Sequence, residues 1–232
     1  MKKSNTNLAI IPARGGSKRL KEKNKLLLGD KPLVCYTIEA ALNSSSITDV
    51  IVSSDSKDIL NIAREYKGVT LHNRSKELSK DHSTALELVN FLFSNQESKY
   101  DFLTLMLPTC PFRDSNHIDE AFKSISDTDD GIISVTEYGF PLELRVVTND
   151  LYIDLPKDSP LVTGNTRSQN HTPALRPNGG FYLNRWSSFN KNRNFWMGNI
   201  KYYLMNREDS VDIDTKLDLK FAQLVLESKK NE

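Results

Sequence analysis

Short apolar runs alternate with segments of helical periodicity along most of this chain. The run from Leu8 to Pro12 is continuously apolar and ends in a glycine-containing loop, which is typical of a strand buried on both faces. Apolar and small residues then recur at helical spacing, at Leu33, Tyr36, Thr37, Ala40 and Ala41. The same criteria predict strands at 50–54, near 69–71, at 102–107 and at 131–135, and helices at 59–66, about 83–93 and near 116–125. This alternation predicts a three-layer α/β fold, in which helices flank both faces of a mostly parallel sheet.

The rhythm is lost between residues 137 and about 175, where polar residues and several prolines dominate. A long irregular stretch inside a compact domain usually has a function, and we interpret it as an inserted small subdomain or dimerisation arm that also forms part of a sugar-binding wall. Strands are predicted to return at 180–183 and 200–205. A final helix is predicted after Thr215, where Thr215 and Asp218 have the spacing of a capping box. We expect this helix to dock on the sheet through Leu217, Phe221, Leu224 and Val225.

Length and charge narrow the class of protein. A chain of 232 residues, 38% of them hydrophobic, suits a single domain spanning residues 1–232. The 31 basic and 30 acidic side chains give a net charge of +1, without the basic surplus of a general nucleic-acid binder.

The cysteines and the lengths of the apolar stretches bear on the cellular compartment of the protein. Cys35 and Cys110 both lie in apolar stretches and form no metal-binding spacing, so we expect reduced core residues. The apolar run 8–11 is too short for a signal peptide, and no stretch approaches the ~20 apolar residues that span a bilayer. We therefore expect a soluble, cytoplasmic protein without a membrane partner.

The first chemical motif is the loop after the first predicted strand, which reads PARGGSKRL and is followed by Lys23 and Asn24. Its position predicts the carboxyl edge of the sheet, where open α/β folds bind ligands. Gly15 and Gly16 allow backbone amides to approach an anion, while Arg14 and Lys23 supply cationic donors for phosphate. The loop matches neither the Walker pattern nor GxGxxG. A basic surface loop with a glycine turn is the alternative interpretation.

The second motif, SVDIDT at residues 210–215, carries two aspartates. Asp212 and Asp214 are two apart in an extended segment, so their carboxylates point to the same side. Two close carboxylates favour a bridging cation, and hard oxygen ligands suit Mg²⁺. In the alternative interpretation, Asp214 caps a helix and Asp212 is a surface charge.

Two further loops follow predicted strands or precede them. LPTCPFR occupies residues 107–113 and RPNGG occupies residues 176–180. Each is weak evidence by itself, because Pro-Asn-Gly is often only a turn.

Taken together, the motifs resemble the acylneuraminate cytidylyltransferases, or CMP-sialic acid synthetases. The ordered elements are IPARGGSKRLKEKN, IVSSD, RSKELSKDHST, LPTCPFR, RPNGGFYL and SVDIDTKLDL, and they extend from about Leu8 to Glu227. The resemblance implies a nucleotide-diphospho-sugar transferase-like fold, a homodimer, and transfer of CMP from CTP to a nine-carbon acidic sugar with release of pyrophosphate.

The resemblance also implies roles for individual residues. Arg14 and Lys23 would be catalytic, Asp212 and Asp214 would bind Mg²⁺, and Arg176 would pair with the sugar carboxylate. The nucleotide site would comprise Arg14, Gly15, Ser17, Lys23, Asn24, Arg74, Ser83 and Thr84, and the sugar site Thr109, Arg176 and Asn178. No general base is identified.

Two positions depart from the family pattern. Leu107 stands where the family commonly has Gln, and Glu143 stands where sialate-specific members often have Lys. Both positions face the sugar in the family, so a legionaminate- or pseudaminate-type acid becomes at least as plausible a substrate as N-acetylneuraminate. The alternatives are a cytidylyltransferase for the eight-carbon acid KDO, whose loop usually reads RLPGKP where this chain reads RLKEKN, and an inactive nucleotide-binding protein.

Overall fold

The computed structural model describes residues 5–80, 82–94, 99–146, 148–149 and 152–231. Positions 147, 150 and 151 of the predicted inserted segment lie outside the described residues. No helix among the described residues has the length and apolar character required to cross a membrane.

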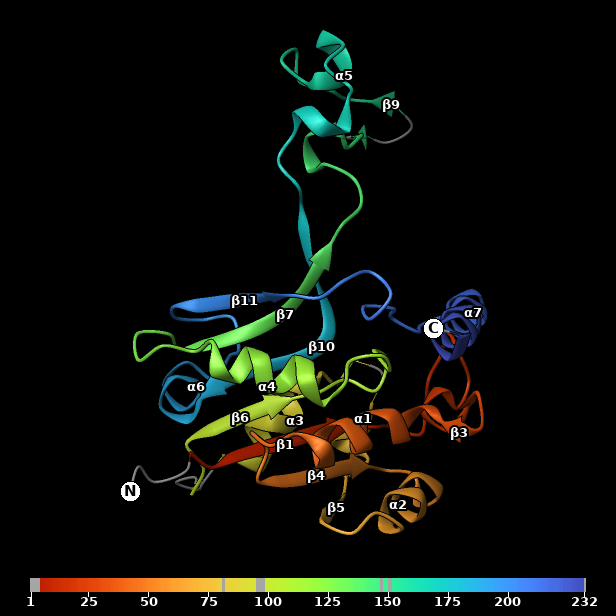
Figure 1. Ribbon diagram of the computed structural model, residues 1–232, viewed down its shortest axis with the longest axis vertical. Coiled ribbons are helices and arrows are strands. Elements are labelled where there is room, and N and C mark those ends of the chain that lie inside the picture. Colours follow the sequence, from red (N-terminus) through yellow and green to blue (C-terminus); the bar gives the residue numbers. More distant parts are fainter. Residues whose placement is uncertain (1–4, 81, 95–98, 147, 150–151, 232) are drawn as a thin grey trace.

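A central sheet dominates the described part of the chain, with seven strands in the order β11-β7-β10-β6-β1-β4-β5 (Figure 1). Every neighbouring pair is parallel except those made by β10, which runs antiparallel to both β6 and β7. The predicted mostly parallel sheet is therefore confirmed. The strands are β1 (Asn7–Pro12), β4 (Asp49–Ser54), β5 (Val69–Asn73), β6 (Phe102–Leu105), β7 (Gly131–Glu137), β10 (Leu175–Arg185) and β11 (Ile200–Leu204).

Helices cover both faces of the sheet, which confirms the three layers. Alternate residues of β1 face opposite sides: Ala9 and Ile11 pack in one core cluster, and Leu8 and Ile10 in another. The first cluster receives α1 (Leu33–Asn43), α2 (Lys57–Arg64) and α4 (Ser115–Lys123), and the second receives α3 (Ala85–Leu92) and α6 (Trp186–Asn192). The sequence did not predict α6, because its seven residues bury only Ser188 and Phe189 and show too little periodicity. Cys35 and Cys110 are buried and free, as predicted.

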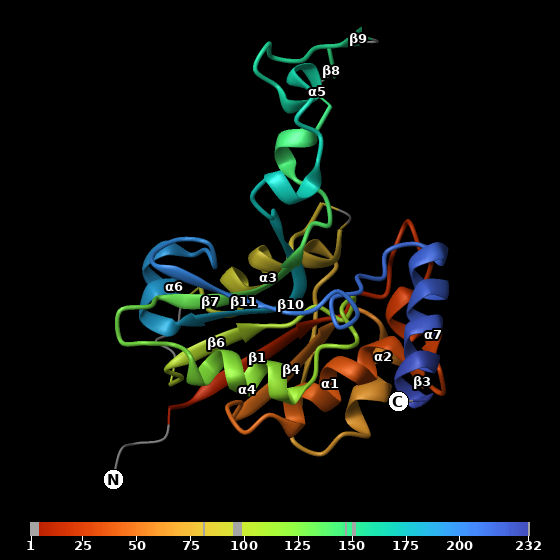
Figure 2. The ribbon, with the colours of Figure 1, turned by 45° about the horizontal axis from the view of Figure 1, so that its top comes forward.

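The segment between β7 and β10 leaves the sheet as a projecting arm (Figures 1 and 2). We call residues 138–174 the arm. Its elements are short: the 3₁₀ helices Leu142–Leu144 and Ser168–Asn170, the paired strands β8 (Thr148–Asn149) and β9 (Tyr152–Ile153), and α5 (Pro160–Thr163).

The C-terminal helix α7 (Lys216–Asn231) packs differently from the prediction. Leu217, Phe221 and Leu224 are 74%, 54% and 64% exposed, so only Val225 of the predicted docking residues is buried. Ala222 and Val225 pack with residues of the loops and of the hairpin formed by β2 (Leu27–Leu28) and β3 (Lys31–Pro32), not with the central sheet. Apolar residues occur on several faces of α7 itself, so their spacing could not identify the face that is buried. Thr215 and Asp218 form the predicted capping box, with Thr215 N–H donating to Asp218 Oδ2 at 2.7 Å and Asp218 N–H to Thr215 Oγ1 at 3.3 Å.

Candidate active site

The glycine loop, residues 12–20, leaves β1 and approaches the segment after β4. The Gly15 amide donates to Asp55 Oδ1 at 2.8 Å, and a Cβ at Gly15 would lie 2.9 Å from the Cβ of Ser56. At position 16, by contrast, a Cβ would meet nothing within 4 Å. Gly15 is therefore required by close packing. Asp55 was not assigned a role from the sequence, although it ends the IVSSD element.

Arg14 and Asn24 connect this loop to its surroundings. The Asn24 side chain is buried, and its Nδ2 donates to the Arg14 carbonyl at 2.9 Å, so Asn24 supports the loop from beneath. The Arg14 guanidinium donates to the Lys80 carbonyl at 3.3 Å. Ser17 lies on the same loop and is partly exposed.

Arg74 is buried behind the glycine loop. It donates to Ser53 through Nε (3.2 Å to Oγ) and Nη2 (3.0 Å to the carbonyl oxygen). Burial lowers the Arg74 pKa to about 10, and the neighbouring Arg14 charge acts in the same direction. Because that value is far above neutral, Arg74 keeps its charge and adds to the positive potential near Arg14.

Ser83 and Thr84, predicted to enclose the nucleotide, make local hydrogen bonds. The Ser83 hydroxyl donates to the Glu77 carbonyl at 3.1 Å. Thr84 caps α3 in a capping box with Glu87, because Thr84 Oγ1 accepts from Glu87 N–H at 3.0 Å and Glu87 Oε2 accepts from Thr84 N–H at 2.8 Å. These bonds fix the start of α3 beside the Lys80 carbonyl that Arg14 contacts.

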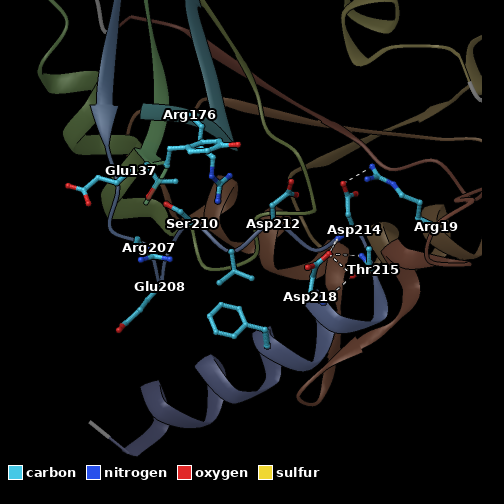
Figure 3. Close-up of a pocket in the computed structure, with 14 residues that line it drawn as sticks. Arg19, Glu137, Arg176, Arg207, Glu208, Ser210, Asp212, Asp214, Thr215 and Asp218 are labelled. Carbon is cyan, nitrogen blue, oxygen red and sulfur yellow. Dashed lines mark hydrogen bonds and ion pairs between the residues drawn. The ribbon is translucent and has the colours of Figure 1, made fainter. Parts of the chain in front are cut away.

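An open pocket of about 520 Å³ is lined by residues of β7, of β10 and of the segment that leads into α7 (Figure 3). We call it the aspartate pocket, because Asp212 and Asp214 both line it, and Arg176 points into it from β10. Its volume falls within the ~300–1,000 Å³ of typical small-ligand sites. Its other lining residues are Arg19, Thr136, Glu137, Tyr138, Arg207, Glu208, Ser210, Val211, Thr215, Asp218 and Phe221.

The glycine-loop region and the acidic pair meet at this pocket. Lys23 Nζ lies 2.7 Å from Asp214 Oδ1, and Arg19 Nη2 lies 2.6 Å from Asp214 Oδ2. The Lys23 side chain is 13% exposed, whereas that of Arg19 is 69% exposed. The basic motif and the acidic pair, far apart in the sequence, therefore lie side by side. Arg19 belongs to the basic motif but was not singled out from the sequence.

Asp212 is accessible from the pocket but partly shielded from bulk water. This shielding raises the pKa of its carboxyl, and the Asp214 charge adds to the effect, while the Thr109 hydroxyl, Lys23 and Arg176 oppose it. Thr109 also holds the segment through its backbone, since its carbonyl accepts from Ile213 N–H at 2.8 Å. Thr109 therefore contacts the acidic segment directly.

Asn178 was predicted to contact a sugar but lies behind the pocket wall. It is 2% exposed, and its amide is engaged with neighbouring residues. Asn178 Nδ2 donates to Ser210 Oγ at 2.8 Å, and Asn178 Oδ1 accepts from Ser134 Oγ at 2.6 Å and from Gly180 N–H at 3.0 Å. A direct sugar contact is not available to this side chain here. Its geometry instead braces Ser210 and the bend in β10.

The carboxylates of Asp212 and Asp214 suit a cation that completes its coordination shell with oxygen atoms of the substrate. Among the described residues, no group of three or more His, Cys, Asp or Glu side chains is placed to hold a metal. Two carboxylates in an open pocket match the habit of Mg²⁺, which takes one or two carboxylates together with phosphates and water.

Comparison with known proteins identifies similar sequences over nearly the whole chain. The family described as Cytidylyltransferase matches residues 8–216. The chain is 35% identical to an N-acylneuraminate cytidylyltransferase of Escherichia coli (97% of this chain, 52% of that protein), and 33% identical to a CMP-N,N'-diacetyllegionaminic acid synthase of Legionella pneumophila (95% and 96%). It is also 30% identical to a pseudaminic acid cytidylyltransferase of Campylobacter jejuni (94% and 95%). The chain thus spans about half the length of the first relative and nearly all of the other two.

A solved structure shares the fold at low sequence identity. A CMP:2-keto-3-deoxy-manno-octonic acid synthetase complexed with CTP superposes with a TM-score of 0.67 at 16% identity, covering 97% of this chain and 100% of that one. This likeness confirms the nucleotide-diphospho-sugar transferase-like fold expected from the sequence.

Proposed function

The chain belongs to the cytidylyltransferase family, and from that premise we propose that it transfers CMP from CTP to the anomeric hydroxyl of a nonulosonic acid. The contact between Lys23 and Asp214 carries the proposal. Lys23 and Asp214 are 191 positions apart in the sequence. Their contact brings the glycine-loop region and the acidic pair to one place, where a triphosphate can meet both.

We assign Mg²⁺ to Asp212 and Asp214. When bound, the cation neutralises charge on the phosphates of CTP. Arg19 and Lys23 both pair with Asp214, so both cations lie beside a carboxylate that lines the pocket.

The reaction is a displacement at the α-phosphorus. The anomeric oxygen of the sugar bonds to that phosphorus, the bond to the β-phosphate oxygen breaks, and pyrophosphate leaves as the hydroxyl proton is lost. Because negative charge accumulates on the phosphate oxygens, catalysis rests on positioning and electrostatic stabilisation. Arg14 and Lys23 supply cationic donors for the phosphates, and Arg176 offers a two-pronged partner for the sugar carboxylate.

For the sugar itself, we favour a nonulosonate of the legionaminate or pseudaminate type. Leu107 lines a largely apolar pocket of about 150 Å³ with Leu105, Tyr182 and Trp196, where the amide expected in the family is absent. The relatives that this chain matches over nearly their whole length are named for legionaminic and pseudaminic acids. We propose that this apolar pocket, which shares no lining residue with the aspartate pocket, receives the sugar side chain, so that a side chain ending in methyl groups is favoured over one with hydroxyls.

We further propose that the arm mediates a homodimer. It carries several large apolar side chains that are about half to three-quarters exposed, which a second copy of the chain would cover. They include Tyr138, Phe140, Leu142, Val146, Tyr152, Ile153 and Val162.

We place the enzyme in the cytoplasm. Its proposed donor, CTP, is an intracellular nucleotide. The two cysteines are buried and free, as in a reducing compartment.

An assay of pyrophosphate release tests the function. The purified chain is incubated with CTP, Mg²⁺ and separately with N-acetylneuraminate, a legionaminate, a pseudaminate and KDO. We expect pyrophosphate release with a nonulosonate, and the highest kcat/KM with either the legionaminate or the pseudaminate. Release with KDO alone would replace the proposal with the KDO activity. Absence of release with every sugar, alongside measurable CTP binding, would indicate an inactive nucleotide-binding protein.

A further inference from the structure

A third aspartate, Asp209, lies just before the acidic pair but does not line the aspartate pocket. Asp209 is 8% exposed, and its carboxylate has two partners. Lys229 Nζ lies 2.7 Å from Oδ1, and His117 Nε2 lies 3.3 Å from Oδ2. Lys229 belongs to the last turn of α7 and His117 to the first turn of α4.

The backbone of Asp209 is held as well. Its carbonyl accepts from Cys110 Sγ at 3.4 Å, and its amide donates to Asn206 Oδ1 at 2.8 Å. These contacts tie one residue to α4, to α7 and to the loop at 107–113. The irregular segment 210–214, which carries both pocket aspartates, begins at this anchored point.

The ion pair itself is well placed to be strong. A mostly buried carboxylate without a partner is strongly destabilising, so Asp209 depends on Lys229. The Lys229 ammonium also lies 5.9 Å above the centre of the Phe112 ring, and a cation at a helix C-terminus interacts favourably with the helix dipole. Asp209, Lys229 and His117 are absent from the lining of the aspartate pocket, so none of them is placed to contact substrate there.

We propose that Asp209 and Lys229 are positioning residues, whose ion pair fixes the start of segment 210–214 and so aims Asp212 and Asp214 into the pocket. The kinetic consequence rests on the proposed function, whereas the structural consequence does not. A pair that only stabilised α7 would leave the acidic segment as ordered as before.

The test compares K229M with K230M and K229R. Lys230 is the exposed neighbour on the same helix and serves as the matched control, while arginine keeps the charge at position 229. Hydrogen exchange is measured on the ligand-free protein, with attention to the Ile213 amide that donates to the Thr109 carbonyl. We expect exchange in peptides covering 206–215 to be about 10-fold faster in K229M, with K230M unchanged and K229R largely restored.

Kinetics give the second readout. We expect kcat for pyrophosphate release to fall about 10-fold in K229M with a smaller change in KM for CTP, which is the size of effect seen when a supporting partner of a ligating group is removed. D209N, which keeps the side-chain shape, is the second variant if K229M does not fold.

The outcomes separate the two proposals. Wild-type exchange at 206–215 in K229M, or equal acceleration in K230M, would overturn the positioning role. If the wild-type protein releases no pyrophosphate with any sugar acid, the proposed function fails, and the exchange data still decide the role of Asp209 and Lys229.

Discussion

The two adjacent glycines of the glycine loop differ in how closely their surroundings pack against them. Gly15 is closed in by Ser56 and hydrogen-bonded to Asp55, whereas Gly16 faces open space. The motif alone suggested the same role for both, namely backbone freedom near an anion. The structure adds a steric reason at Gly15 that depends on a segment about 40 residues away. No local pattern carries that information.

Gly15→Ala should destabilise the loop. The new Cβ would approach Ser56 Cβ to 2.9 Å, which requires a backbone shift costing about 1–3 kcal/mol. Urea unfolding of G15A, G16A and the double variant G15A/S56G measures the effect. We expect G16A to have the same free energy of unfolding as the wild type. In the double variant, S56G should recover part of the stability that G15A loses, because it removes the clashing Cβ. Equal stability of G15A and G16A would contradict the packing argument.

Asp214→Ala tests the metal assignment. Loss of one of two cation ligands should lower kcat by about 100-fold at physiological Mg²⁺, because charge on the phosphates is then less well neutralised. The thermal midpoint should also fall, because the mostly buried Lys23 loses its ion-pair partner, so rates are compared well below that midpoint. Rates are measured across a Mg²⁺ titration, with D127A as control, since Asp127 is fully exposed on a loop. Near-normal rates for D214A would show that the assignment is wrong.

At the scale of elements, the sequence predicted strands and most helices well but did not identify the buried face of α7. Buried parallel strands such as β1 and β4 read as continuous apolar runs, so their positions are encoded locally. In α7, apolar residues occur on several faces, and the choice of Ala222 over Leu224 depends on the loops and hairpin beneath. A small side chain lets the helix approach this uneven surface closely. Periodicity cannot reveal such a constraint.

Ala222→Asp should therefore lower the stability of the protein far more than Leu224→Asp. Asp at the fully buried position 222 would carry an unpaired charge into the core and cost about 3 kcal/mol or more. Asp at position 224, which is 64% exposed, should change stability by less than about 0.5 kcal/mol. Chemical denaturation of both variants provides the comparison. A larger loss for L224D would support the docking face predicted from the sequence.

Asp119 joins two helices and should make stability pH-dependent. Burial alone would raise the pKa of this α4 carboxyl, but hydrogen bonds from Ser44, Ser46 and Ser45, just after α1, lower it well below its usual range. A carboxyl whose pKa is lower in the folded state contributes stability above its unfolded pKa of about 3.9 and loses it as pH falls through the folded value. We expect D119A to be less stable than the wild type by about 1–2 kcal/mol at pH 7, allowing for partial exposure. In urea unfolding this gap should narrow between pH 5 and pH 3, and a gap independent of pH would exclude the ionised carboxylate as its source.

At the scale of the whole molecule, order along the chain predicted which motifs share a sheet edge. Loops that follow parallel strands gather at one end, which placed the glycine loop at the carboxyl edge of the sheet. The meeting of Lys23 and Asp214 was implied by the family resemblance and not by topology. The partners of Asp209 and Asn178 were not predicted, because their contacts depend on side-chain packing between distant segments. The arm could be located only by its lack of periodicity, and its short elements had no pattern to reveal them.

The arm supplies the last prediction, which concerns assembly. Tyr152 and Ile153 are 78% and 66% exposed on β9, and the arm projects away from the sheet, so a second copy is the partner that we expect to cover them (Figure 2). Sedimentation velocity should show a dimer for the wild type and a monomer for Y152D/I153D. Two charges in an apolar interface should raise the dissociation constant at least about 100-fold, equivalent to about 2.7 kcal/mol. L217D, on the exposed face of α7, is the matched control and should remain dimeric. A monomeric wild type, or a dimer that L217D disrupts and Y152D/I153D does not, would remove the arm from the interface.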